Sequence, residues 1–100
     1  MEERGSIQGD VRVSDELILH GMITGNTTVV SGGVLVLHGM CCQDLILERG
    51  SKVILHGLVS GSVHNNGGEL EIYGQIVRDL HRNSGQTVIH KKAVINGAIR

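Results

Sequence analysis

Short runs of alternating aliphatic and polar residues follow one another along the whole chain, and most of them end at a glycine. The run Leu17-Ile-Leu-His-Gly21 returns as Leu35-Val-Leu-His-Gly39 and as Val53-Ile-Leu-His-Gly57, each 18 residues further on. Two looser copies follow at spacings of 17, Leu70-Glu-Ile-Tyr-Gly74 and Thr87-Val-Ile-His-Lys91, the last with lysine in the glycine position. Self-similarity at a nearly fixed spacing indicates a repeat architecture, in which each unit stacks on the next.

An 18-residue unit made of three short aliphatic segments predicts one coil of a triangular β-solenoid. Each side then takes about six residues, and successive coils pair as parallel strands about 4.8 Å apart. A β-sandwich would need antiparallel hairpins and would not explain one pentapeptide at constant spacing. We therefore predict an all-β fold, a single-stranded triangular parallel β-helix of about five coils of 17–18 residues. The predicted single domain spans residues 1–100, with a partial first coil at 1–14 and successive coils at 15–32, 33–50, 51–67, 68–85 and 86–100.

Side-chain alternation along a strand separates the interior from the surface. In the predicted interior, equivalent aliphatic residues of successive coils form columns. Because each buried aliphatic side chain contributes roughly 1.5–3 kcal/mol, such columns stabilise the solenoid without aromatic residues. The predicted columns are Leu17, Leu35, Val53, Leu70 and Thr87; Leu19, Leu37, Leu55, Ile72 and Ile89; Ile23, Cys41, Val59 and Ile76; and Thr27, Leu45, Val63 and Leu80.

The same alternation points a second set of residues outward on one flank. It combines aliphatic residues, a series of histidines interrupted by a tyrosine, and two methionines. An exposed apolar surface of this extent is larger than scattered surface residues require, so it predicts a protein-binding surface. We call it the His face, and its residues are Ile18, His20, Met22, Val36, His38, Met40, Ile54, His56, Leu58, Tyr73 and His90.

Composition supports a thin, regular interior and excludes several functions. Aromatic residues make up 1 % of the chain, proline is absent and glycine supplies 15 residues. The net charge of −1 gives no electrostatic footprint for nucleic acid, and the missing aromatics remove the platforms on which single strands stack. No apolar run reaches the roughly 18 residues of a membrane span. We predict no nucleic-acid partner, no membrane span and a cytoplasmic location.

The histidine series is the most evident candidate for metal chemistry. Histidine is a common zinc ligand, but side chains stacked on a flat face run parallel and do not converge on one ion. We therefore predict no metal, no cofactor and no enzyme. A left-handed β-helix acyltransferase or zinc enzyme is a remote alternative, since such enzymes want a small residue after each inward aliphatic. Those positions here are Ile18, Thr24, Val30 and Val36.

Several other polar or reactive residues receive structural interpretations. Cys41 falls in an inward column, so we expect its thiol to lie in the core. We expect the side chain of Cys42 to point outward. Asn65-Asn66 and Asn83 predict a corner where asparagine adopts unusual backbone dihedrals and the amides stack. His64 and His81 occupy equivalent outward positions and predict a solvated pair.

Charge is distributed unevenly along the predicted axis. Residues 1–16 carry five acids against two arginines, and residues 78–100 carry five bases against one aspartate. Solenoid ends expose unpaired strand edges, which proteins usually cap or block. The opposite charges either favour head-to-tail stacking or simply block edge pairing, and the sequence leaves both readings open.

The glycine-punctuated runs Leu17-Ile-Leu-His-Gly-Met-Ile-Thr-Gly25 and Val53-Ile-Leu-His-Gly-Leu-Val-Ser-Gly61 resemble the core of the bactofilins, bacterial polymer-forming cytoskeletal proteins. This resemblance implies a right-handed β-helix and end-to-end self-association without a nucleotide. The function we predict is a non-catalytic, bactofilin-like assembly module that forms homo-oligomers. The alternative is an immunity protein that binds and neutralises a bacterial toxin.

Overall fold

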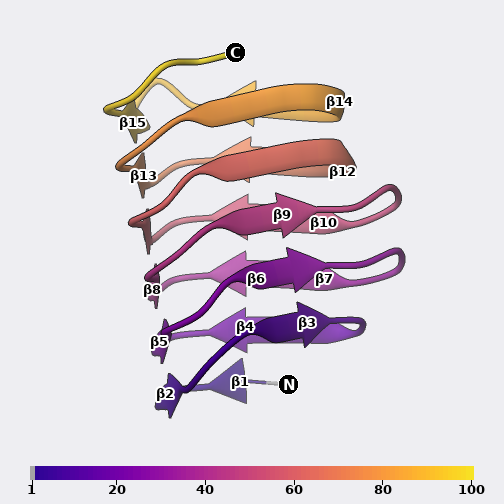
Figure 1. Cartoon of the computed structure of the whole chain (residues 1–100), viewed down its shortest axis with the longest axis vertical. Helices are drawn as coiled ribbons and strands as arrows, with labels where there is room; N and C mark the ends of the chain where they lie inside the picture. The colour runs from indigo at the N-terminus through magenta and orange to yellow at the C-terminus, as the bar shows by residue number, and fades with distance from the viewer. Residues whose placement is uncertain (1) are drawn as a thin grey trace.

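The chain winds into a solenoid of about five turns in which all neighbouring strands are parallel. The computed structural model describes residues 2–100, and regular structure within that range consists of β-strands. The strands nearest the viewer, β3 (Val11–Val13), β6 (Thr27–Val29) and β9 (Leu45–Leu47), run from left to right (Figure 1). The strands behind them return while the chain climbs, which is the right-handed sense. The predicted all-β parallel solenoid is confirmed.

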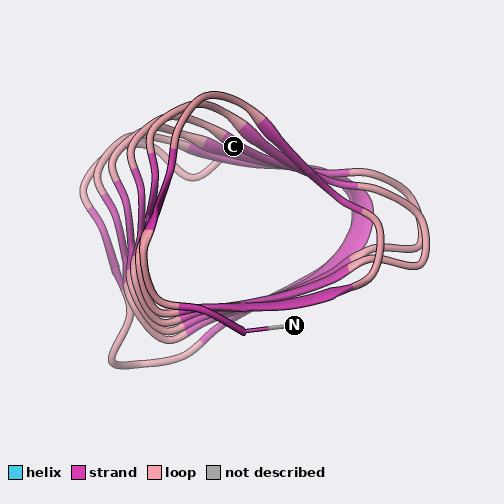
Figure 2. Cartoon of the chain, turned by 90° about the horizontal axis from the view of Figure 1, so that it is seen from below, coloured by secondary structure: helices cyan, strands magenta, loops and turns pink. Residues whose placement is uncertain are grey.

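Each coil has three sides, seen end-on in Figure 2. Side 1 holds β1 (Glu2–Glu3), β4 (Glu16–Leu19), β7 (Val34–Leu37), β10 (Lys52–Leu55) and the later parts of β12 (Val63–Ile72) and β14 (Leu80–Ile89). Side 2 holds β2 (Ser6–Ile7), β5 (Met22–Ile23), β8 (Met40–Cys41), β11 (Leu58–Val59), β13 (Gln75–Ile76) and β15 (Val94–Ile95). Side 3 holds β3, β6, β9, the first parts of β12 and β14, and residues 98–100, which pair with the start of β14.

Strand register places the repeated residues directly above one another. Leu17 pairs with Leu35, Leu35 with Val53, and Val53 with Leu70, so the pairing follows both the 18-residue and the 17-residue spacing. A parallel ladder in this register keeps the same face of every strand inward. The like-over-like stacking expected from the repeat is therefore present.

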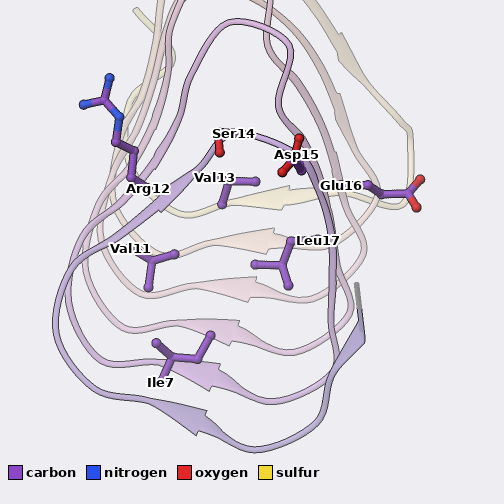
Figure 3. A pocket seen from close by; sticks show the side chains of 8 residues that line it. All are labelled: Ile7, Val11, Arg12, Val13, Ser14, Asp15, Glu16 and Leu17. Atoms are coloured by element: carbon purple, nitrogen blue, oxygen red, sulfur yellow. The ribbon is translucent and has the colours of Figure 1, made fainter.

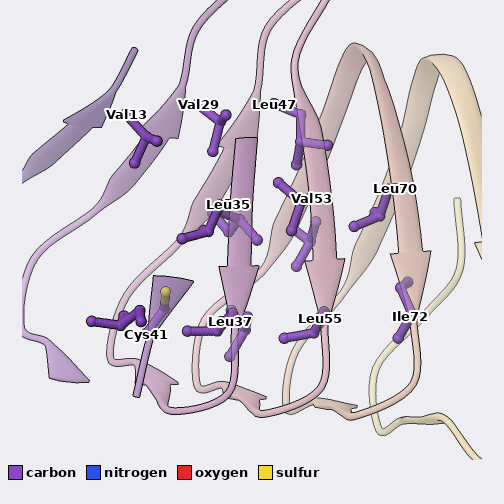
Figure 4. Packing of buried hydrophobic residues seen from close by; sticks show 14 of the residues in the cluster. Val13, Val29, Leu35, Leu37, Cys41, Leu47, Val53, Leu55, Leu70 and Ile72 are labelled. Atoms are coloured by element: carbon purple, nitrogen blue, oxygen red, sulfur yellow. The ribbon is translucent and has the colours of Figure 1, made fainter. Parts of the chain in front are cut away.

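The core consists of the predicted columns and one further column that was not predicted from the repeat. Most predicted inward residues have no more than 5 % of their surface exposed, and Figure 4 shows their side chains filling the interior. Thr87 and Ile89 are more exposed, because none of the described residues forms a strand that covers side 1 of the last coil. The additional column lies on side 3 and contains Val13, Val29, Leu47 and Asn65.

Asn65 lies at the start of the predicted corner, and its side chain is fully buried there. Its Nδ2 donates to the backbone oxygen of Gln86 (2.9 Å) and to Oγ1 of Thr87 (3.1 Å). Its Oδ1 accepts from the backbone nitrogens of Gly67 (3.2 Å) and Gly68 (2.8 Å). The amide thus satisfies backbone groups where β12 runs through the corner between sides 3 and 1. A buried amide with all these partners is well tolerated in a core.

The neighbouring asparagines partly follow the prediction. Nδ2 of Asn83 donates to Oδ1 of Asn66 at 2.8 Å, so amides of successive coils do interact. No described non-glycine residue has a positive φ, and the expected unusual dihedrals are therefore absent from residues 2–100. The positive φ values at this corner belong to glycines, Gly67 (140°) and Gly85 (77°), and not to the asparagines.

Glycine is required at the corner between sides 1 and 2 because successive coils approach closely there. A Cβ added at Gly21, Gly39, Gly57 or Gly74 would lie 1.8–2.0 Å from the backbone oxygen of the glycine one coil below. Placing Lys91 at this position was wrong. The nitrogen of Val94 donates to the oxygen of Gly74, so Lys91 and Lys92 form a two-residue widening of the corner. Figure 2 shows one coil leaving the common outline at its lower left corner.

A ladder of polar side chains stabilises the corner between sides 2 and 3. Its members, Asp10, Asn26, Asp44, Ser62 and Asp79, each accept a hydrogen bond from a backbone nitrogen one coil later. The bond from Ala98 lowers the pKa of Asp79 from its ordinary value, with Arg100 contributing in the same direction. Such side-chain acceptors replace strand pairing where the backbone turns.

Candidate functional site

The rings of the His face form a single file along the solenoid axis. His20, His38 and His56 have centroids 5.0 and 4.9 Å apart, with ring planes within 6° of parallel. Tyr73 continues the stack at 5.0 Å from His56, and His90 follows at 4.8 Å with a tilt of 41°. This spacing matches the distance between neighbouring strands. The file is therefore a direct result of the register.

The apolar members of the His face form two further rows beside the rings. Ile18, Val36 and Ile54 are in register on side 1, and Met22, Met40 and Leu58 are in register on side 2. All six are half-buried, so the face is less exposed than the sequence suggested. The structure thus brings all eleven predicted residues together on one flank, while their role in binding a partner remains a prediction.

Carboxylates flank the file near its two ends. Nε2 of His20 lies 3.6 Å from Oε2 of Glu2, and the hydroxyl of Tyr73 donates to Oε1 of Glu71 at 3.1 Å. The bond to Glu71 raises the pKa of Tyr73. Between these ends, His38 stacks on rings on both sides. The rings do not converge, and residues 2–100 contain no group of three or more His, Cys, Asp or Glu placed to hold a metal ion.

A second pair of imidazoles lies on side 3. His64 and His81 stack with centroids 4.5 Å apart and planes 4° from parallel. Nε2 of His64 is 4.0 Å from Oδ2 of Asp44. The predicted pair is therefore stacked on the surface, and it stands apart from the His face.

The N-terminal end surface carries a small apolar cavity. Its volume is about 180 Å³, and Figure 3 shows Ile7, Val11, Val13 and Leu17 pointing into it. The lining is completed at the rim by Arg12, Ser14, Asp15 and Glu16. Within residues 2–100, no strand lies beneath β3, which is why the cavity is open. The acidic charge of this end could be predicted from the sequence, but the cavity could not.

The C-terminal end surface exposes aliphatic residues that continue the inner columns or border them. Ile89, Val94 and Ile99 have 38 %, 50 % and 47 % of their surface exposed. The residues of β14 on side 1 pair with β12 below, and none of the described residues pairs with them from above. The basic residues Lys91 and Lys92 are exposed beside them. This end is therefore both apolar and basic.

The two cysteines differ as predicted. Cys41 is buried, and burial raises its pKa from 9.0 to about 11. Its Sγ lies 3.6 Å from Oγ1 of Thr27, a contact that works in the opposite direction on the pKa. Cys42 is half-buried, and both thiols are free. Because the thiolate is the reactive form, Cys41 is an inert core residue.

Comparison of the chain with protein-family models, with curated proteins and with solved structures found no match. Among residues 2–100, no helix is present that is long and apolar enough to span a membrane. The β-solenoid is thus established by the structure, and the resemblance to bactofilins enters only the proposal that follows.

Proposed function

We propose that this chain is a non-catalytic assembly module that self-associates end to end, as its resemblance to the bactofilins implies. The observation that carries the proposal is the match between the two end surfaces. Both present strand edges on the same three sides and aliphatic side chains on sides 2 and 3, and their charges are opposite. A second copy of the chain is therefore the occupant that best fits each end.

The backbone edges of the two ends are equivalent. The first coil presents β1, β2 and β3 on sides 1, 2 and 3, and the last coil presents the end of β14, β15 and residues 98–100 on the same sides. A second copy displaced along the axis would pair these strands in the parallel register used throughout the solenoid. Unpaired edges are templates for such pairing.

The side chains of the two ends continue common columns. Successive pairings connect Ile7 to Ile95 along side 2, and Val11 to Ile99 along side 3. We call the contact between the C-terminal end of one copy and the N-terminal end of the next the joint. In the joint, Ile95 and Ile99 of one copy would lie over Ile7 and Val11 of the next, at the N-terminal cavity. Burying these aliphatic surfaces favours association.

Charge selects the orientation of the joint. Residues 1–16 hold five acidic and two basic side chains, and residues 78–100 hold five basic and one acidic side chain. An N-terminal end against a C-terminal end brings opposite charges together, whereas like ends repel. The His face would then run as one continuous lateral surface along the assembly, and we propose it as the contact for a further protein.

Light scattering over a concentration series tests the proposal. We expect the average mass to rise with concentration, and the substitution Ile99→Asp to abolish the rise by placing a charge in the joint. Val77→Asp is the matched control, because Val77 is similarly exposed (38 %) but residues 94–98 lie between it and the end surface. A strictly monomeric chain at all concentrations would contradict self-association and favour the toxin-binding alternative.

A further inference from the structure

Glu3 is an exception to the aliphatic interior. It pairs with Leu19, and so occupies the inward column that continues through Leu37, Leu55 and Ile72. Glu2, the preceding residue, is exposed, while Glu3 is half-buried. Oε1 of Glu3 accepts a hydrogen bond from the nitrogen of Gly5 at 3.0 Å, which holds the carboxylate at the corner between sides 1 and 2.

The opposite end departs from the repeat at the same corner. There the last coil contains the additional residues Lys91 and Lys92, inserted between His90 and Ala93. Both lysines are exposed. One end of the solenoid thus carries the Glu3 carboxylate at this corner, beside the exposed Arg4, whose guanidinium is paired with Glu2 (3.1 Å). The other end carries two cations.

The register would bring these two exceptions together in an end-to-end joint. Ile89 ends the column to which Glu3 belongs, so Glu3 of one copy would face Ile89 of the next, beside the lysine corner. We propose that Glu3 forms an ion pair with Lys91 or Lys92 of the adjoining copy and that this pair fixes the polarity and register of the joint. The inference rests on the proposed end-to-end assembly.

The ion pair contributes to the specificity of the joint more than to its strength. A carboxylate buried against an aliphatic side chain without a partner is strongly unfavourable, and a nearby lysine offsets this penalty. A like-end joint, or a copy rotated to another side, would bury Glu3 away from the lysines. The pair therefore acts mainly by excluding wrong joints, which is a well-attested use of buried charge.

Charge reversal tests the ion pair, with a matched control in the adjacent residue. We expect Glu3→Lys to raise the concentration needed for half-assembly at least about tenfold, which corresponds to about 1.4 kcal/mol. Glu2→Lys changes the net charge equally but at an outward position, and should change that concentration less than about threefold. Adding Lys91→Glu and Lys92→Glu to Glu3→Lys should restore assembly. Circular dichroism of each variant establishes that it is folded.

The unmodified chain provides an independent measurement. A carbodiimide joins a carboxylate to a lysine that contacts it, so we expect a cross-linked peptide between Glu3 and Lys91 or Lys92 in the dimer fraction. If the original chain assembles but Glu3→Lys and Glu2→Lys have equal effects, the ion pair is overturned and end-to-end assembly stands. The same holds if the original chain assembles and the cross-link is not found. A chain that does not assemble at all would contradict the proposed function itself.

Discussion

Gly39 is the position at which a single methyl group should do most damage. A Cβ added there would lie 1.8 Å from the backbone oxygen of Gly21, whereas carbon atoms make ordinary contacts at about 3.5 Å. The coils would have to separate by about 1.5 Å at this corner. Three backbone hydrogen bonds would be weakened, those from His38 and Gly39 to the oxygen of Leu19 (2.8 and 3.0 Å) and from Met40 to Gly21 (3.0 Å).

The magnitude of this effect can be worked from those contacts. Three hydrogen bonds at about 1 kcal/mol each, with about 1–3 kcal/mol of overpacking strain, give a loss of about 4–6 kcal/mol for Gly39→Ala. This is a large part of the roughly 5–15 kcal/mol that stabilises a typical domain. We expect the melting temperature, followed by circular dichroism, to fall by at least about 15 °C, or the variant not to fold.

Gly5 is the matched control for this substitution. It occupies the same corner in the first coil, where an added Cβ would meet only Oε1 of Glu3, at an ordinary 3.4 Å. We expect Gly5→Ala to change the free energy of unfolding by less than about 1 kcal/mol. Equal melting temperatures for Gly39→Ala and Gly5→Ala would refute the close stacking of coils on which the whole fold depends.

Three further predictions concern buried or hydrogen-bonded polar groups. The pKa of Cys41 is raised from 9.0 to about 11 in the folded chain. Its contribution to the free energy of unfolding is therefore fully present below pH 9 and is lost as the pH rises to 11. Urea unfolding should therefore show a loss of about 3 kcal/mol over this range that Cys41→Val does not share. Because the pKa of Asp79 is lowered in the folded chain, its carboxylate contributes to the free energy of unfolding above the ordinary pKa of 3.8. This contribution is lost as the pH falls through the folded pKa. Asp79→Asn should flatten that part of the acid unfolding curve, and an unchanged curve would contradict the corner bond. Asn65→Ala removes the partners of several buried backbone groups and should lower the free energy of unfolding by about 2–4 kcal/mol. A loss below about 0.5 kcal/mol, which is typical of a surface substitution, would contradict its structural role.

The inner columns were predictable because their residues repeat in kind. Leu, Val and Ile recur at intervals of 17 or 18, and parallel pairing turns equal intervals into vertical columns. The column through Val29 and Leu47 was missed because its last buried member is Asn65, a polar residue that hides the pattern. A polar side chain can occupy a core only where other polar groups bond to it. For Asn65 these are the backbone nitrogens of Gly67 and Gly68 in the same coil and the backbone oxygen of Gln86 in the next coil.

The features of the end surfaces were less accessible to the sequence. Glu3 pairs with Leu19 across 16 residues, so counting back by 18 does not reveal that it points inward. The widening at Lys91 and Lys92 comes after His90, and the spacing of the preceding histidines and tyrosine therefore gives no sign of it. The file of rings, by contrast, follows from the repeat alone, because side chains at equivalent positions of a parallel ladder must stack.

Small-angle X-ray scattering over a concentration series tests the central claim most directly. The monomer has a longest extent of 30 Å and shorter extents of 24 and 20 Å. End-to-end assembly predicts that the maximum dimension grows in steps of about 30 Å, the length of one chain, while the cross-sectional radius stays constant. A maximum dimension that stays near the monomer value at every concentration, or a cross-section that widens as mass increases, would contradict it.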